Sequence, residues 1–405
     1  MSLPIKLIQE PYRIFFPLGV LMGMIGVGHW LFFGLGLIDQ YLGFQHASIQ
    51  IQLFMFCFIT GFLLTAMPKI LLADPCSPFE VLFFLVLVAG MITFEFLTLW
   101  VGVQISFLIG ISSLHLFILK RGRCRKAPLP AEFSLLFLGF FHAVSGTFLL
   151  ILYQMGWFPG WGMGLGRQLF QLGFLLCIVM SIGGFMLPRF LGYYSAESVS
   201  LELNSAKRER KRKKELAFHL CVGIVLFLSF WLEPLGLSRF SFFLRALFVT
   251  AQLFITTKIY RPLPVRTPFN LLVWASLWSL ILGLWGIFLF PQYHMAMKHF
   301  VFIGGVSLMT FTVATKVIYS HAGLEGAFHK RMLFMGFFGG FIFAALFFRV
   351  LADLLPEAYF VMLSLAASFW LIGVVIWLVV VFPKLLFSPQ GPIGCPRGCK
   401  AQNSR

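Results

Sequence analysis

Twelve apolar segments, each long enough to cross a lipid bilayer, follow one another along this sequence. A helix of about 20 residues spans the roughly 30 Å of hydrocarbon in a membrane. The segments are expected near 14–38, 46–72, 79–101, 103–120, 131–155, 166–191, 215–233, 240–258, 267–290, 294–319, 327–352 and 357–382. Composition agrees, because 60% of the 405 residues are hydrophobic and only 11% are charged. Such a chain is a membrane protein.

The twelve segments are expected to be α-helices. In the bilayer core every backbone polar group needs a partner within the protein, which a helix or a closed β-barrel provides. The segments lack the two-residue alternation of barrel strands. The sequence therefore predicts an all-α polytopic bundle of about twelve transmembrane helices, as one domain over 1–405. Two six-helix halves, 1–195 and 215–385, are joined by a basic loop at 196–214, and a short tail covers 386–405.

Lys and Arg are unevenly distributed over the segments that connect the helices. If the N-terminus is cytoplasmic, the outer segments keep five of the 31 basic residues: Arg167, Arg239, Arg245, Lys298 and Arg349. Because basic residues favour the cytoplasmic side of a membrane, both termini are predicted to be cytoplasmic. One helix more or less would move every later connecting segment to the opposite side of the membrane and destroy this bias. The bias therefore supports the count of twelve.

The formal net charge of +17 requires no nucleic-acid partner. Its densest part, AKRERKRKKE at 206–215, falls in the predicted cytoplasmic loop, where basic clusters contact anionic lipid headgroups. Membrane lipid is therefore the expected partner of this run. The cysteines lie within spans or on the reducing side of the membrane, so disulfides are not expected.

Two histidines bracket the tenth apolar segment, HFVFIGGVSLMTFTVATKVIYSH at 299–321. Ionisable groups are costly inside a membrane and usually mark a functional site. His299 and His321 lie about 33 Å apart along a helix that rises 1.5 Å per residue, so they cannot hold one metal ion together. At about 100° per residue they share a helix face with Thr310, and this polar face should point into the bundle.

The second apolar segment has a similar polar stripe. By the same rotation, the face of His46 also carries Gln50, Cys57 and Thr60. His46 and His299 both begin their helices at the predicted outer surface, whereas His321 stands at the inner surface. Because imidazole is a common ligand of haem iron and of copper, His46 and His299 are candidate ligands of one outer site.

Other polar residues in the membrane are further candidates. His142, in the middle of the fifth segment, is a candidate metal ligand or proton-path residue, and the alternative is a hydrogen bond to a neighbouring helix. His29 and His294 are alternatives for an additional outer ligand. Glu95, toward the outer end of the third segment, is expected to be protonated or paired, and proton delivery is a possible role.

Three stretches resemble the NnrS family of haem- and copper-containing membrane proteins, which is linked to bacterial handling of nitric oxide and nitrosative stress. They are GFLLTAMP after His46, GGFMLPRF at 183–190 and HFVFIGGVSLMTFTVATKVIYSHAG at 299–323. The resemblance implies a twelve-helix bundle in the inner (plasma) membrane of a bacterium. It also implies a small gaseous ligand such as nitric oxide.

The resemblance further implies a redox cofactor. We expect a b-type haem that is bound non-covalently, because no C-x-x-C-H attachment sequence occurs, and copper is left open as a second metal. Arg167 and Arg189, at the two ends of the sixth segment, are candidates for pairing with haem propionates, with lipid headgroup contact as the alternative. The candidate cofactor-binding residues are His46, His299, Arg167 and Arg189, and the candidate metal ligands are His46, His299, His321 and His142.

The sequence departs from the family pattern at two places. Lys316 stands where many members have Arg, which keeps the charge but loses the bidentate fork of a guanidinium. After His46 the chain reads Ala47, Ser48, Ile49 and Gln50, where members often carry a second His and a Glu, so fewer donors are present for a second metal.

Three classes of function stay open at this point. The first is a haem, or haem and copper, protein that senses, binds or detoxifies nitric oxide or a related small ligand, with or without turnover. The second is a secondary transporter of a small solute, because twelve spans in two halves is also the plan of many carriers. The third is a metal- or haem-handling assembly factor. The sequence identifies neither a catalytic residue nor an electron donor.

Overall fold

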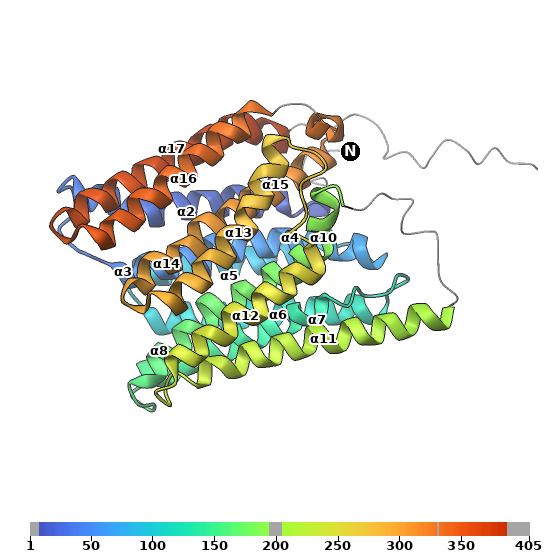
Figure 1. Cartoon of the computed structure of the whole chain (residues 1–405), viewed down its shortest axis with the longest axis horizontal. Helices are drawn as coiled ribbons and strands as arrows, with labels where there is room; N and C mark the ends of the chain where they lie inside the picture. The colour runs from blue at the N-terminus through green and yellow to red at the C-terminus, as the bar shows by residue number, and fades with distance from the viewer. Residues whose placement is uncertain (1–7, 194–204, 330–331, 387–405) are drawn as a thin grey trace, which may run out of the picture.

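The computed structural model describes residues 8–193, 205–329 and 332–386, and the described residues contain helices and no strand. Twelve described helices are long and apolar enough to cross a membrane, which confirms the predicted all-α class and number of spans (Figure 1). Each predicted span overlaps one of them.

In the first half the α-helices are α2 (Tyr12–Gly34), α3 (Gly43–Ser48), α4 (Phe56–Leu71), α5 (Pro78–Phe96), α6 (Trp100–Arg123), α7 (Phe133–Gln154), α8 (Trp161–Gln168), α9 (Phe174–Ile178) and α10 (Gly184–Phe190).

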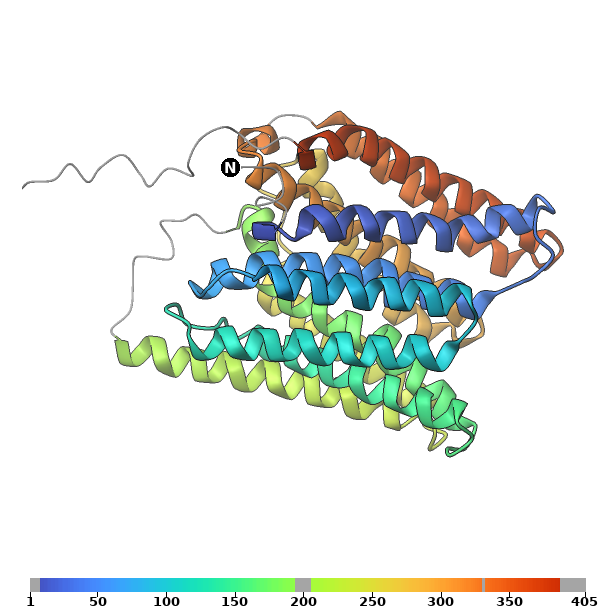
Figure 2. The same cartoon turned by 180° about the vertical axis from the view of Figure 1, so that it is seen from behind.

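The second half continues the bundle. Its α-helices are α11 (Ser205–Trp231), α12 (Ser238–Thr257), α13 (Pro268–Leu289), α14 (His294–His299), α15 (Leu308–His321), α16 (Leu333–Leu354) and α17 (Tyr359–Leu386). The two halves pack along their lengths, since α17 contacts α2 and α11 contacts α7. Seen from behind, α2 crosses the bundle next to α17 (Figure 2).

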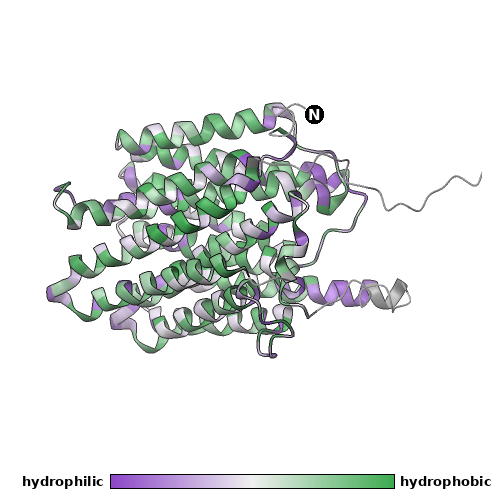
Figure 3. Ribbon diagram, turned by 90° about the horizontal axis from the view of Figure 1, so that it is seen from above, coloured by the Kyte–Doolittle hydropathy of each residue, from purple (hydrophilic) through white to green (hydrophobic). Residues whose placement is uncertain are grey.

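Helix α11 corrects the predicted loop at 196–214. The helix begins at Ser205 and therefore includes the basic run at 206–215. Most of this run extends beyond the apolar bundle (Figure 3). Lys, Arg and Glu are good helix formers, and pairs four residues apart stabilise such an exposed helix. Lys213 and Glu209 form one such pair, with Nζ and Oε1 3.1 Å apart. Residues 196–204 and 387–405, including Cys395 and Cys399, lie outside the described residues.

The second, sixth and tenth spans form the centre of the bundle. In their most apolar windows 89%, 78% and 72% of the residues are buried, more than in any of the other nine described spans. These same three spans carry the stretches GFLLTAMP, GGFMLPRF and HFVFIGGVSLMTFTVATKVIYSHAG. These three motif stretches therefore lie in the most buried of the described spans.

The three central spans contain π-helical segments, which the sequence did not predict. They are η1 (Ile49–Met55) between α3 and α4, η2 (Leu169–Gly173) and η3 (Val179–Gly183) in the sixth span, and η6 (Phe300–Ser307) between α14 and α15. A π-turn holds more residues than an α-turn and changes the direction of the side chains that follow, and π-segments occur often at functional sites. The predicted rotation of 100° per residue is therefore wrong within these segments.

Candidate functional site

A cavity of about 470 Å³ is lined by residues of α3 and α14, among other elements. These two helices lie at the end of the bundle opposite the N-terminus (Figure 1). Its walls come from the first, second and sixth spans and from the tenth to twelfth spans. Aromatic side chains form part of the walls, and the indole of Trp370 donates to Ser307 Oγ at 3.2 Å. The volume is within the range of small-molecule and cofactor sites.

His46 lines this cavity from α3, at the start of the second span. Its Nδ1 lies 2.8 Å from the backbone carbonyl oxygen of Gly26 on α2. A carbonyl only accepts a hydrogen bond, so this contact assigns the proton to Nδ1 and leaves the Nε2 lone pair free. Metal-binding histidines are commonly oriented by such a bond from the second ring nitrogen. His46 thus has the tautomer of a metal ligand.

His299 lines the same cavity from α14, at the start of the tenth span. Its Nδ1 lies 2.7 Å from the carbonyl oxygen of Met295, one turn earlier in the helix, so Nδ1 donates and Nε2 is again the free nitrogen. Two imidazoles from different spans therefore face one cavity, and each has a nitrogen that can accept a bond from a metal ion. The sequence predicted this pairing, and the structure brings the two residues together.

Close packing between α2 and the second span positions His46. Gln50 Nε2 donates to the Gly23 carbonyl oxygen at 2.9 Å, one turn of α2 from the Gly26 carbonyl that receives His46. A Cβ at Gly26 would lie only 2.6 Å from Gln50 Nε2 and 2.8 Å from Ile49 Cγ2. The absence of a side chain at Gly26 lets the two helices approach closely enough for this bond.

We expect Gly26→Ala to destabilise the protein, because the new methyl group overpacks the contact with Gln50 and Ile49. Such overpacking typically costs about 1–3 kcal/mol. Gly28→Ala is the matched control on the same helix, since a Cβ there meets its nearest neighbour at an ordinary 3.8 Å. Thermal unfolding of both variants in detergent measures the difference. Equal melting temperatures would show that this contact does not determine the position of the second span.

Three basic side chains line the cavity, and they give it a positive charge. Arg167 comes from α8, Lys298 from α14 and Arg349 from α16, and none of the described residues that line the cavity is Asp or Glu. Arg349 pairs with Asp353 at 2.7 Å, whereas Arg167 lies over the ring of Phe44, with 5.7 Å between the guanidinium carbon and the ring centroid. Because charges interact strongly away from bulk water, the cavity suits a ligand with anionic groups.

Lys298 and Arg349 are site residues that sequence reasoning missed. The signal was nevertheless present, because both are among the five basic residues on the predicted outer side. Of these five, Arg167, Lys298 and Arg349 line the cavity. Arg245, a fourth, is buried and pairs with Glu233. Four of these five basic residues therefore line the cavity or form a buried ion pair, and the fifth, Arg239, is exposed.

The family comparison agrees with the three motif stretches. A model of the NnrS protein family matches residues 6–388, which is nearly the whole chain. The chain belongs to the NnrS family. At the level of the family, it is a nitric-oxide-related membrane protein. No curated protein shows a significant match to the chain.

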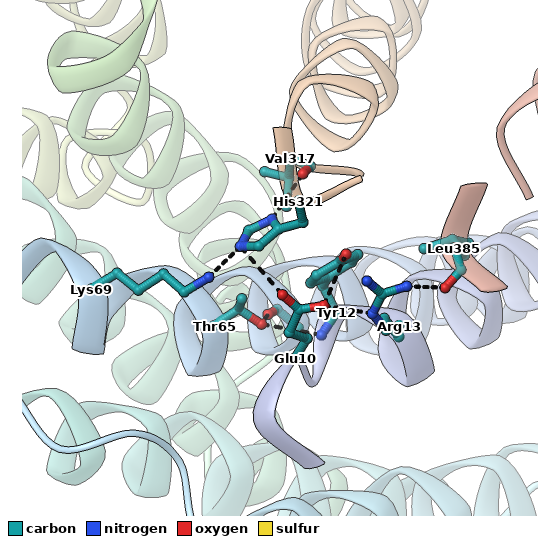
Figure 4. Close-up of polar contacts among 9 residues, drawn as sticks. Glu10, Tyr12, Arg13, Thr65, Lys69, Val317, His321 and Leu385 are labelled. Carbon is teal, nitrogen blue, oxygen red and sulfur yellow. Dashed lines mark hydrogen bonds and ion pairs between the residues drawn. The ribbon is translucent and has the colours of Figure 1, made fainter. Parts of the chain in front are cut away.

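His321 of this NnrS protein lies in a separate polar cluster at the N-terminal end of the bundle (Figure 4). Its Nδ1 donates to the Val317 carbonyl oxygen at 2.8 Å, and its Nε2 contacts the ammonium group of Lys69. Glu10 Oε1 lies 4.0 Å from the same Nε2, and the Tyr12 ring lies 5.0 Å from the imidazole. The nitrogen that a metal ion would need is therefore in contact with a cation.

The other predicted residues also lie outside the cavity. His142 Nδ1 donates to the Leu138 carbonyl oxygen at 2.7 Å, and its buried Nε2 has no hydrogen-bond partner. Arg189 lies near the other end of the sixth span, over the ring of Phe185. No cluster of three or more His, Cys, Asp or Glu side chains suited to a metal ion occurs among the described residues. A metal in the cavity would therefore rely on His46 and His299.

Neither of the two alternative outer histidines lines the cavity. His29 Nε2 accepts a hydrogen bond from the Leu42 backbone N–H at 3.2 Å, so its lone pair is occupied. His294 is exposed, and its Nδ1 lies 3.2 Å from the Pro291 carbonyl oxygen. As candidate metal ligands, His29 and His294 therefore rank below His46 and His299. The sequence alone did not make this distinction.

Glu95 belongs to a buried polar network behind the second span. Its Oε2 lies 2.7 Å from Ser48 Oγ, which is also 2.7 Å from Gln52 Oε1. Gln52 in turn exchanges hydrogen bonds with Gln104 of α6, at 2.8 and 3.2 Å. None of these four residues lines the cavity. The network joins the third and fourth spans to the π-helical segment that follows His46.

Proposed function

We propose that this protein binds a b-type haem non-covalently in the large cavity and uses it to bind nitric oxide or a related small ligand. The observation that supports the proposal is that two imidazoles, His46 and His299, line one cavity together with three basic side chains, and that each uses Nδ1 for a backbone hydrogen bond, which leaves Nε2 for a metal ion. When bound, haem would supply an iron that can take a diatomic ligand.

The residues of the cavity fit a haem. Its volume of about 470 Å³ and its aromatic walls suit a large planar ring. His46 and His299 are the candidate iron ligands, and Arg167, Lys298 and Arg349 are the candidate partners of the two propionates. Arg167 was predicted for this role from the sequence. Copper is proposed only as an accessory metal, because the described cavity offers two imidazoles and no carboxylate or thiol beside them.

We also propose an orientation in the inner (plasma) membrane of a bacterium, with both termini in the cytoplasm. The bias of Lys and Arg toward one side of the twelve spans supports it. The large cavity would then open at the outer side, and the basic start of α11 would contact anionic lipid headgroups on the inner side.

A carrier of a small organic anion is the second candidate function. The same three cations favour it, because a cavity with positive charge and no carboxylate in its described lining also suits a carboxylate-bearing solute. A haem-handling assembly factor would share the haem site but would pass the haem to another protein.

An absorption spectrum of the detergent-purified protein separates these classes. We expect a Soret band that shifts on addition of nitric oxide, because the gas can replace one of the two imidazoles on the iron and so change its ligation. Extraction with acidified acetone should release the haem, since no covalent attachment motif is present. A colourless protein from haem-replete cells that still binds organic anions would instead support the carrier.

A further inference from the structure

A second, smaller cavity of about 80 Å³ lies between the second, sixth and tenth spans. Its lining is apolar, and Thr310 is the one polar side chain among the described residues that form it. The Thr310 hydroxyl already donates to the Val306 carbonyl oxygen at 2.8 Å. The inner cavity, as we call this space, therefore offers no free hydrogen-bond donor from the side chains that line it.

The inner cavity adjoins the large one. Met55 and Val306 line both cavities. Both residues belong to π-helical segments, Met55 to η1 and Val306 to η6, and the sixth-span segment η3 supplies Val179, Ile182 and Gly183 to the inner cavity. The segments η1, η3 and η6 thus all contribute to the inner cavity, and η1 and η6 also line the large one.

The size and chemistry of the inner cavity restrict its occupant. A buried water molecule needs two to four polar partners, which this lining does not provide. A charged solute would lose its hydration without compensation. The volume is also too small for a porphyrin. A small uncharged gas molecule fits, and such molecules dissolve readily in the hydrocarbon that surrounds the bundle.

We propose that the inner cavity is a docking site for a small uncharged gas, from which the gas passes to the large cavity between Met55 and Val306. Methionine suits this position, because its unbranched side chain changes rotamer easily and can open the passage without moving a helix. The identity of the gas as nitric oxide rests on the proposed function, whereas the site itself does not.

Xenon tests the site without any need for haem. In protein labelled with ¹³C-methyl methionine, the signals of Met55, Met186 and Met309 should shift saturably as xenon pressure rises, because these three side chains line the inner cavity. Met155, which is 45% exposed and lies outside the described lining of both cavities, should show only the non-saturating drift caused by xenon in the micelle. A linear drift of all four signals would overturn the proposal.

Val313→Phe tests the passage of gas. Val313 lines the inner cavity, so the larger ring should fill it, abolish the saturable xenon shift and slow nitric oxide binding to the ferrous haem roughly tenfold, which corresponds to about 1.4 kcal/mol on the barrier. Val361→Phe, at a position that is 60% exposed, is the matched control and should change neither measurement. Equal binding rates in both folded variants would refute the passage.

The haem proposal and the gas-site proposal can be contradicted independently of each other. Saturable xenon binding in a colourless protein would support the gas site and contradict the haem, whereas a haem spectrum with no saturable xenon shift would contradict the gas site alone. If Val313→Phe does not fold, the xenon titration of the unaltered protein still decides whether the inner cavity binds gas.

Discussion

Replacing His46 or His299 by alanine is expected to remove most of the haem from the purified protein. Each imidazole is held by an Nδ1–H bond to a backbone carbonyl, so its Nε2 is directed and free. Even loss of a residue that merely orients a metal ligand costs about 10–100-fold in affinity, and loss of the ligand itself should cost at least as much. The ratio of Soret absorbance to protein concentration, measured for each variant, reports the loss.

Two other histidines provide controls for this experiment. His294→Ala alters an exposed imidazole at the same end of the bundle, outside the cavity lining. His321→Ala removes an imidazole that contacts Lys69 at the opposite end. Both variants should keep the haem of the unaltered protein. Similar losses in all four variants would contradict the separation of the His299 and His321 sites, and no loss from His46→Ala and His299→Ala would refute both ligand assignments.

Removing a cavity cation is expected to weaken haem binding by a smaller but measurable amount. Arg167→Gln and Lys298→Gln each remove one positive charge that faces the cavity. A hydrogen bond to a charged group contributes about 1.5–3 kcal/mol, which corresponds to roughly 10–100-fold in affinity. The rate at which haem passes to an excess of a haem-scavenging protein measures the effect. Arg349 is less suitable, because its removal would also leave Asp353 without its partner.

Arg239→Gln and Arg189→Gln are the matched controls for the cation variants. Arg239 is exposed on α12, outside the described cavity lining. Arg189 lies over Phe185, away from the cavity, although the sequence made it a candidate for the propionates. Haem loss as fast from Arg189→Gln as from Arg167→Gln would mean that the propionates lie elsewhere and that the cavity assignment is wrong.

The sequence predicted the spans well because a bilayer imposes a strong constraint. Each crossing needs about 20 apolar residues, and the charge bias checks their number independently. The exceptions to this charge bias also mark residues of the cavity. Lys298 and Arg349 are basic residues on the predicted outer side, yet their convergence with Arg167 depends on which spans are neighbours.

The direction of side chains around the central helices could not be predicted reliably from the sequence. A rotation of 100° per residue assumes an uninterrupted α-helix, and the central spans contain π-helical segments at 49–55, 169–173, 179–183 and 300–307. The predicted inward direction of the tenth span still holds, since Thr310 contacts Met55 and His321 contacts Lys69, both on the second span. The π-helical segments also supply residues to both cavities, and no periodicity in the sequence indicated this.

The sequence alone determined the membrane location, the number of spans and the presence of imidazoles near their ends, because hydropathy and charge act locally and can be read residue by residue. Only the tertiary structure decided which imidazoles share a cavity, which nitrogen of each is free and which cations accompany them. Those properties depend on contacts between residues far apart in the chain, such as the bond from His46 to Gly26 and the meeting of the second, sixth and tenth spans.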